Sequence, residues 1–370
     1  MGQKRFIFLL AMLAFWVVVT VVSERFDWDR SLISTYFYLP ETGFFRAQEP
    51  LFQWFFQKGT YAGPILTLSA AFFWALGYFR PRMQKYQRQF LVVLLTALVG
   101  GGILVNGFLK DYWGRPRPRE VKIYAGLWNY HPISELGTPG KGKSFPCGHC
   151  TSAFLATSLW VFIPTNPVLG TLAVIAGLTY GSLMSMARMA QGGHFPTDAF
   201  WALGVVAQVS LLFYLLLVRP QSRARRRGLS RKGRIWLTFG LLVFSVAVVI
   251  AFMSRRPYFK SYQLDLDVPQ TTKQLELQFN IQPSQFKVRY QPLNAPGIHV
   301  DVQGLGWTEA THGLKLARTG SKDSTLLKVQ LNPIGYYSEI HHLVVLTLPL
   351  SLQHTVQITT TNHIDPPLPE

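Results

Sequence analysis

Long apolar stretches alternate with short polar loops over the first two thirds of the chain. Uncharged runs cover residues 6–22, 59–79, 90–109, 199–218 and 235–253, and a longer one covers residues 150–187. A helix needs about 20 apolar residues to cross a bilayer, and Pro164 and Pro167 divide the longest run into two helices. The pattern predicts seven transmembrane helices. No small-residue cleavage site follows the first run, so we expect an uncleaved anchor.

Beyond Ser254 the spacing of apolar residues changes to two. Apolar and polar residues alternate in short runs, which Gly-, Pro- and Asn-containing turns separate. The alternating apolar positions are Tyr262, Leu264, Leu266, Val268, Leu275, Leu277, Phe279, Ile281, Phe286, Val288, Tyr290, Ile298, Val300, Val302, Leu314, Leu316, Leu327, Val329, Leu331, Val344, Leu346, Leu348, Val356 and Ile358. Period two is typical of half-buried strands, so we expect about eight strands in a sandwich or roll.

The two patterns together define the predicted fold class. It is a mostly α membrane protein with a six-helix core and a seventh transmembrane helix, followed by an all-β soluble domain. The boundaries that we expect are residues 1–234 for the six-span core, 235–254 for the seventh helix and 255–370 for the extracytoplasmic β domain.

Basic residues gather beside the apolar runs, in clusters at residues 4–5, 80–88 and 219–234. We therefore interpret the formal net charge of +18 as a signal of membrane orientation and anionic lipid contact rather than of nucleic-acid binding. Seven alternating spans put all three clusters on one side, which the positive-inside rule identifies as cytoplasmic. The intervening loops at residues 110–149 and 188–198 are then expected on the outer face, as is the β domain.

The first candidate motif for phosphate chemistry begins where the third apolar run ends. Lys110 is followed after six residues by Arg117 and Pro118. The loop stays basic as far as Lys143, against the usual charge bias of outer loops. We interpret these cations as a phosphate-binding site. The alternative is a belt of snorkelling side chains at the membrane surface.

Two further motifs precede the fourth and sixth spans. Residues 144–149 have the sequence SFPCGH; such a turn opens a helix whose N–H groups can bind an anion, and His149 can donate a proton near neutral pH. Arg188, His194 and Asp198 form the third motif. If that stretch is helical, Asp198 accepts from one ring nitrogen of His194 and leaves the other as a nucleophile. Taken singly, each motif is also compatible with a capping turn or a buried polar loop.

Together the three motifs resemble the signature of the type 2 phosphatidic acid phosphatase family, which is Lys-x6-Arg-Pro, then Pro-Ser-Gly-His, then Ser-Arg-x5-His-x3-Asp. The resemblance covers about residues 90–218 and leaves the seventh span and the β domain outside. Cys147 and Ala187 stand where the family has serine. A thiol is a weaker donor than a hydroxyl, and a lost hydrogen bond to a charged group costs about 1.5–3 kcal/mol. The change at Cys147 therefore predicts a weaker hold on phosphate.

The resemblance implies a two-step phosphoryl transfer. His194 attacks phosphorus and becomes a phosphohistidine, Asp198 orients the ring, and His149 protonates the leaving lipid oxygen and then activates water. The groups implied to hold the phosphate oxygens are Lys110, Arg117, Arg188 and the backbone at Cys147 and Gly148. Because three fixed cations can balance the phosphate charge, we expect neither a metal nor another cofactor.

The implied function is that of an integral-membrane lipid phosphate phosphatase of the bacterial cytoplasmic (inner) membrane, with its site on the periplasmic face. Its partners are then a membrane lipid phosphate and the bilayer, with no nucleic acid. Arg115, Arg119 and Lys122 near the motifs favour a head group with more than one anionic group. Lipid A 1-phosphate, undecaprenyl diphosphate and phosphatidylglycerol phosphate all qualify, and the sequence identifies no partner for the β domain.

Other functions stay open at the level of the sequence. The phosphohistidine can pass its phosphoryl group to a second lipid, which makes the protein a phosphotransferase, and the two lost serines are compatible with an inactive anchor for the β domain. Cys147 and Cys150 form a Cys-x-x-Cys sequence, as in thiol–disulfide oxidoreductases, although the strand and βαβ fold that such a motif needs are not predicted here. A Cys147–Cys150 disulfide, favoured in an oxidising compartment, is predicted to distort the His149 turn and inhibit the enzyme.

Overall fold

The computed structural model describes residues 3–126, 128–139, 142–218 and 231–253 and, farther along the chain, 256–266, 274–280, 285–291, 297–306, 311–320, 324–334, 337–350 and 355–360. The chain divides into two compact units. One consists of Met1–Tyr124 with Asn129–Met253, and the other of Ala125–Trp128 with Ser254–Glu370. We call them the helical unit and the β unit.

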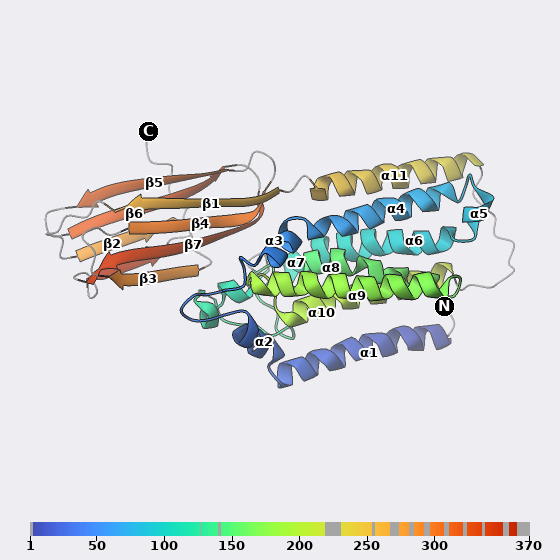
Figure 1. Ribbon diagram of the computed structural model, residues 1–370, viewed down its shortest axis with the longest axis horizontal. Coiled ribbons are helices and arrows are strands. Elements are labelled where there is room, and N and C mark those ends of the chain that lie inside the picture. Colours follow the sequence, from blue (N-terminus) through green and yellow to red (C-terminus); the bar gives the residue numbers. More distant parts are fainter. Residues whose placement is uncertain are drawn as a thin grey trace. The chain divides into compact units, whose positions relative to one another are not determined.

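Helices that run alongside one another make up the helical unit (Figure 1). The longer helices are α1 (Gln3–Arg25), α4 (Ala62–Leu76), α6 (Gln87–Leu95), α9 (Pro167–Ala190), α10 (Pro196–Leu217) and α11 (Arg231–Met253). α6 continues directly into a π-helix, η2 (Thr96–Leu109), and then into α7 (Lys110–Tyr112). The shorter elements are α2 (Trp28–Tyr36), α3 (Pro50–Gln57), η1 (Gly59–Tyr61), α5 (Pro81–Gln84), η3 (Pro118–Glu120) and η4 (Lys122–Tyr124).

Within the described part of the chain, five helical segments are long and apolar enough to cross a membrane: Phe6–Arg25, Gly59–Leu76, Gln87–Tyr112, Pro167–Ala190 and Pro196–Leu217. They coincide with the first, second, third, fifth and sixth predicted spans. At the fourth, α8 (Gly148–Phe154) and the 3₁₀-helix η5 (Leu155–Phe162) have seven and eight residues. Because a 3₁₀-helix rises more per residue than an α-helix, the two together still reach about 26 Å. α11 lies where the seventh span is expected, and the count of seven stays a prediction.

Large apolar side chains cover the outer faces of these helices. Phe8, Ile65 and Leu172 are 58%, 60% and 59% exposed, although soluble monomers rarely expose extended apolar surface. Such faces are suited to lipid. The side chains of Lys4 and Arg5 and residues 219–230 lie outside the described part of the chain, so the orientation inferred from the basic clusters stays a prediction.

The loop between α9 and α10 is fixed at both ends by local backbone chemistry. Gly192 adopts a left-handed conformation, φ 60°, which suits glycine and lets the chain turn away after the end of α9. Pro196 is the first residue of α10, and Asp198 in the same turn accepts a hydrogen bond from the Phe195 N–H at 2.8 Å. These features are typical of a helix start, and they place His194 between two helix ends.

The described residues of the β unit form eight strands in two sheets of four. One sheet has the order β1 (Arg256–Asp265), β4 (Gly297–Gly306), β7 (Tyr337–Pro349), β3 (Gln285–Gln291), and the other has the order β5 (Thr311–Gly320), β6 (Ser324–Ile334), β2 (Gln274–Phe279), β8 (Val356–Thr360). Pairs β3–β7, β2–β6 and β2–β8 are parallel, and the other three pairs are antiparallel.

One apolar core lies between the two sheets of the β unit. Val300 and Val344 from the first sheet and Leu277 and Val329 from the second belong to a single buried cluster. These are positions that the period-two pattern assigns to buried faces, so the strands of the C-terminal region are confirmed. Two of the alternating positions, Val268 and Ile281, lie outside the described residues.

Candidate active site

Residues of all three predicted motifs are buried in the helical unit. These residues are Lys110 in α7, Arg117 before η3, His149 in the first turn of α8, Arg188 in the last turn of α9, His194 in the loop that follows, and Asp198 in the first turn of α10. Arg117 and Arg188 are only 2% and 1% exposed. Burying charges costs free energy unless they are paired or bind a ligand, so this interior is unusual for a helical bundle.

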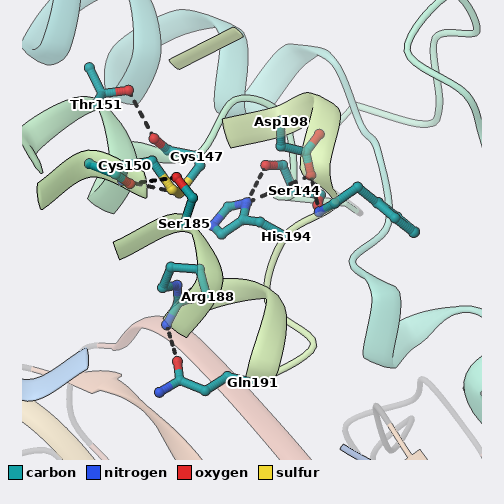
Figure 2. Close-up of a disulfide and its surroundings, with 11 residues drawn as sticks. Ser144, Cys147, Cys150, Thr151, Ser185, Arg188, Gln191, His194 and Asp198 are labelled. Atoms are coloured by element: carbon teal, nitrogen blue, oxygen red, sulfur yellow. Dashed lines mark hydrogen bonds and ion pairs between the residues drawn. A yellow bond between two sulfur atoms is a disulfide. The ribbon is translucent and has the colours of Figure 1, made fainter. Parts of the chain in front are cut away.

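Phe56 of α3 brings the second and third motifs together. The Phe56 ring stacks on the His149 ring with centroids 6.2 Å apart, and the Arg188 guanidinium carbon lies 5.1 Å from the Phe56 centroid. Arg188 also donates from Nη1 to Gln191 Oε1 at 2.7 Å. A Cβ on Gly193 would lie 2.8 Å from Arg188 Nη2, so the guanidinium folds back toward the loop that carries His194 (Figure 2).

Asn106 connects the first motif to the turn of the second. Asn106 Oδ1 lies 2.6 Å from the point where a Cβ on Gly148 would stand, so the close approach requires glycine at that position. Lys110 follows Asn106 by four residues in the continuous η2–α7 helix. Side chains four residues apart lie on about the same helix face, so Lys110 is on the side of the helix that faces α8.

A backbone carbonyl holds His194, the predicted nucleophile. His194 Nδ1 lies 2.6 Å from the Ser144 carbonyl oxygen but 3.8 Å from Asp198 Oδ2. The predicted direct hydrogen bond from His194 to Asp198 is therefore wrong. The prediction assumed one helical turn between the two residues, whereas His194 precedes α10.

Ser144 links Asp198 to His194 (Figure 2). Its hydroxyl donates to Asp198 Oδ2 at 2.5 Å, and its carbonyl accepts from the His194 ring. Asp198 thus positions the imidazole through an intermediate residue. No role for Ser144 was predicted, because a serine beside a proline turn has no specific sequence signal.

The environment of His194 keeps its ring neutral. Because a carbonyl only accepts, Nδ1 carries the proton and the lone pair is on Nε2. Burial is the main cause that lowers the pKa of His194 from 6.5 to about 4; Asp198 opposes this shift, and Arg188 and Arg117 add to it. In the described part of the structure Nε2 is buried without a hydrogen-bond partner. A neutral ring with a free lone pair is the state that nucleophilic attack needs.

Cys147 and Cys150 form a disulfide at the start of α8 (Figure 2). The Cys147 N–H donates to the Asp198 carbonyl at 3.2 Å, and the Cys150 N–H donates to Cys147 Sγ at 3.1 Å. α8 begins at Gly148 and carries His149 in its first turn, so the disulfide and a formed helical turn coexist. Ala187, the other departure from the family pattern, is fully buried in apolar surroundings, and nothing in the structure explains its missing hydroxyl.

Arg115 was expected to face the head group of a ligand, but it is paired with two carboxylates of the protein instead. Its fully buried guanidinium donates from Nη1 to Asp198 Oδ1 at 2.6 Å and from Nη2 to Asp29 Oδ2 at 2.5 Å. Burial lowers the pKa of Arg115, but the two carboxylates outweigh it and hold the pKa above its usual value. The interpretation of Arg115 as an extra head-group cation is therefore wrong. Asp29 was not predicted, because it is one of three acids that follow the first apolar run and no motif distinguishes it from Glu24 and Asp27.

An apolar pocket with a cavity volume of about 80 Å³ adjoins the turn at Gly148. Residues of α4, η2 and α8 line it, among them Thr67, Gly101, Gly102, Asn106 and Gly148. Side chains added at Gly101 or Gly102 would meet nothing closer than 3.8 Å. The glycines of η2 therefore keep open an apolar space that ends at Gly148.

Known proteins match the part of the chain that holds this site. Residues 89–222 match the PAP2 superfamily. A lipid A 4'-phosphatase of Francisella tularensis subsp. novicida is 32% identical over 144 residues, which is 37% of this chain and 62% of that protein. A lipid A 4'-phosphatase of Rhizobium leguminosarum is 32% identical over 33% of this chain and 52% of that protein. A lipid A 1-phosphatase of Rhizobium etli is 30% identical over 34% of this chain and 50% of that protein.

The chain thus matches between a half and about three fifths of these relatives' lengths. No solved structure matches it. The matched region, residues 89–222, includes Lys110, Arg117, His149, His194 and Asp198. The family suggested by the three motifs is thereby confirmed for this region: residues 89–222 are a domain of the PAP2 superfamily, that of the type 2 phosphatidic acid phosphatases.

Proposed function

We propose that the protein is an integral-membrane lipid phosphate phosphatase that works through a phosphohistidine on His194. The observation that carries this proposal is the state of the His194 ring. Nδ1 is held 2.6 Å from the Ser144 carbonyl, while Nε2 is buried without a partner in the described structure and the pKa is about 4. A neutral ring that keeps one lone pair available beside buried cations is suited to attack on a phosphate ester.

In the first step, Nε2 of His194 forms a bond to phosphorus as the bond from phosphorus to the lipid oxygen breaks. His149 gives its proton to the departing oxygen. The His194 ring keeps its Nδ1 proton and becomes positively charged. In the second step, His149 takes a proton from water, the water oxygen bonds to phosphorus, and the N–P bond breaks to release inorganic phosphate and neutral His194.

The remaining residues of the site bind the negatively charged phosphate and do not exchange protons with it. Lys110, Arg117 and Arg188, with the amide at Gly148, bind the phosphate oxygens. The Cys147 amide, which the resemblance implied for the same role, instead donates to the Asp198 carbonyl at 3.2 Å. Removing one donor from such a site typically costs about 10²–10³-fold in rate. The same groups suffice for charge balance, so we propose a reaction without metal.

A membrane lipid is the proposed substrate. The pocket beside Gly148 is small, about 80 Å³, but its mostly apolar lining is suited to contact with a short stretch of an acyl chain. Three relatives are named lipid A phosphatases. We therefore rank lipid A phosphates first, ahead of undecaprenyl diphosphate and phosphatidylglycerol phosphate. With this function we propose a six-span core over residues 1–234, a seventh helix over 235–254 and a β domain over 255–370, with site and β domain on the periplasmic face of a bacterial inner membrane.

The other functions are less well supported. A phosphotransferase differs only in the acceptor of the second step. An inactive anchor has no need to keep His194 neutral and aligned. A thiol–disulfide oxidoreductase needs a sulfur that a partner can reach, whereas Cys147 and Cys150 are both fully buried.

The test is phosphate release by the purified protein in detergent with EDTA. Lipid A, undecaprenyl diphosphate and phosphatidylglycerol phosphate are offered in turn. His194→Ala removes the nucleophile, and His131→Ala is the matched control because the His131 side chain is 36% exposed and pairs with Glu135. We expect release by the wild type and by His131→Ala and none by His194→Ala. Equal release by His194→Ala would contradict the proposal.

No release of phosphate from any lipid calls for a second assay with labelled lipid phosphate and an unlabelled lipid acceptor. Label in the acceptor lipid would establish the phosphotransferase. Its absence there as well would favour the inactive anchor.

A further inference from the structure

A continuous chain of short polar contacts leads from α2 to the nucleophile. Asp29 Oδ2 accepts from Arg115 at 2.5 Å, and Arg115 donates to Asp198 at 2.6 Å. Asp198 accepts from the Ser144 hydroxyl at 2.5 Å, and the Ser144 carbonyl accepts from His194 at 2.6 Å. All the steps are buried, and they join α2, two loops and α10.

Both oxygens of Asp29 are fixed in this chain. Oδ1 accepts from the Thr197 N–H at 3.0 Å, and Oδ2 accepts from the Thr197 hydroxyl at 2.6 Å and from the Tyr130 hydroxyl at 3.2 Å. Thr197 is in the first turn of α10, next to Asp198. Asp29 therefore holds the start of the helix that carries Asp198.

Arg115 is immobilised between the two carboxylates. Its guanidinium carbon lies 4.6 Å from the Phe195 ring centroid and 5.7 Å from that of Tyr130. Its Nε donates to the His131 carbonyl at 2.9 Å. Aromatic rings contact the guanidinium and hydrogen-bond partners surround its edge, so it is held in one position. Its hydrogen bond then fixes the position of Asp198.

The charges of the cluster matter as much as its geometry. Asp29, Arg115 and Asp198 together carry two negative charges and one positive charge. An Arg115–Asp198 pair alone would be neutral, so Asp29 gives this three-residue cluster a net charge of −1. Asp198 Oδ2 is 3.8 Å from His194 Nδ1, and the ring becomes a cation when Nε2 bonds to phosphorus. A negative cluster fixed at that distance stabilises this cation.

We infer that Asp29 and Arg115 are positioning residues for phosphoryl transfer, which hold Asp198 in place and leave the cluster beside His194 negatively charged. This inference rests on the proposed function. It extends the working site to α2, although the PAP2 match begins at residue 89. Nothing in the three sequence motifs assigns Asp29 a part in the chemistry.

The test compares Asp29→Asn with Asp27→Asn in the full-length protein. Both variants exchange a carboxylate for an amide on the same short segment. Asp27 is a suitable control because its side chain is 42% exposed and pairs only at the surface, with Arg30 at 2.7 Å, and because asparagine tolerates its left-handed φ of 50°. For each variant we would measure kcat and KM with the lipid that the wild type hydrolyses, together with the thermal unfolding midpoint in detergent.

We expect Asp29→Asn to lower kcat about 10- to 100-fold, as for other residues that orient a first layer of catalytic groups. KM should stay within about threefold of the wild type, because Asp29 does not face the phosphate. Asp29→Glu, which restores the charge, should recover part of kcat, and Asp27→Asn should match the wild type. A merely structural Asp29 would lower the amount of folded enzyme and leave kcat per folded molecule unchanged, which would overturn the inference.

If Asp29→Asn fails to fold, Arg115→Lys replaces it. Lysine keeps the positive charge but cannot bridge two carboxylates with a planar fork, so we expect the same fall in kcat at nearly constant KM. A wild-type kcat in folded Arg115→Lys would also overturn the inference. A wild type that releases no phosphate would instead refute the proposed function, and this inference with it, before any variant is compared.

Discussion

The interiors of the two units differ in the side chains that they bury. The buried ionisable residues of the helical unit include Asp29, Lys110, Arg115, Arg117, Arg119, His149, Arg188, His194 and Asp198. Among the described residues of the β unit, the buried polar side chains are Thr325, Gln330 and His342, and its core cluster is wholly apolar. Both units have a buried apolar core, but among the described residues a cluster of buried charged side chains, whose desolvation works against folding, occurs in the helical unit alone.

This difference indicates whether stability or function constrains the buried residues of each unit. An apolar core stabilises a fold with little demand on residue identity beyond size and pattern. Perturbed, buried ionisable groups are instead concentrated at functional sites. We therefore expect substitutions of the same kind to affect catalysis in the helical unit and stability alone in the β unit.

The largest expected contrast comes from removing one arginine in each unit. Arg188→Ala takes away a buried phosphate-binding cation, so kcat/KM should fall about 10²–10³-fold. Arg289→Ala, at an exposed position on β3, should leave kcat/KM within about twofold. Phosphate release from the preferred lipid is the measurement. Equal losses in the two variants would show that the contrast between the units does not hold.

The next contrast concerns acid. With a His194 pKa of about 4, the nucleophile stays neutral at pH 5.5, whereas a histidine of pKa 6.5 would lose about tenfold of its neutral form there. We expect the acid limb of kcat/KM that belongs to His194 to lie near pH 4. The account of His194 burial would be contradicted by an acid limb of kcat/KM near pH 6.5 that persists when each of the other histidines is substituted.

The same depressed pKa has a consequence for stability. The unfolded chain binds a proton at His194 below about pH 6.5, and the folded chain only below about pH 4. The contribution of this group to folding is therefore fully present above pH 6.5 and is lost as the pH falls through this window. In His194→Gln, the thermal midpoint of the helical unit should depend less on pH between 6.5 and 4.

A smaller effect is expected at the disulfide. Disulfide-bonded Cys147 has no hydrogen to donate to phosphate, and Cys147→Ser combined with Cys150→Ser supplies the hydroxyl of the family pattern. Because α8 forms a regular first turn, we expect KM to fall several-fold in the double variant with kcat preserved. Cys150→Ser alone serves as the control. A severe loss of activity in the double variant would mean that the cross-link itself maintains the turn.

The smallest effect on activity is expected in the core of the β unit. Leu277→Ala removes a fully buried side chain and should destabilise the β unit by about 2–5 kcal/mol. Phosphate release at 25 °C should stay within about twofold of the wild type. Unfolding monitored for the β unit and activity measured on the same preparation test this together. A parallel loss of activity would show that the catalytic site depends on the β unit.

Much of this architecture could be predicted from the periodicity of the sequence. Uncharged runs located five helices of membrane-spanning length, and alternating residues such as Leu275, Leu277 and Phe279 located buried strand faces, because burial acts on local patterns. The fourth span was predicted without its 3₁₀ half. Apolar composition does not distinguish an α-helix from a 3₁₀-helix, since the difference lies in backbone hydrogen bonds.

The contacts inside the site were less predictable than its residues. The motifs pointed to His149, Arg188 and His194. However, Asp198 is linked to His194 through Ser144, because His194 lies before the start of α10. Asp29 lies 86 residues before Arg115. A pair so distant, with no repeat and no motif around Asp29, is decided by tertiary packing alone.

The most direct test of the account is to trap the phosphoryl group on the enzyme. The protein is mixed with its preferred lipid bearing radiolabelled phosphate, quenched in alkaline detergent because N–P bonds break in acid, digested and mapped. We predict transient label on the peptide that contains His194, longer-lived label in His149→Ala because the second step lacks its base, and none in His194→Ala. Rapid phosphate release with no label on that peptide, or label that persists in His194→Ala, would contradict it.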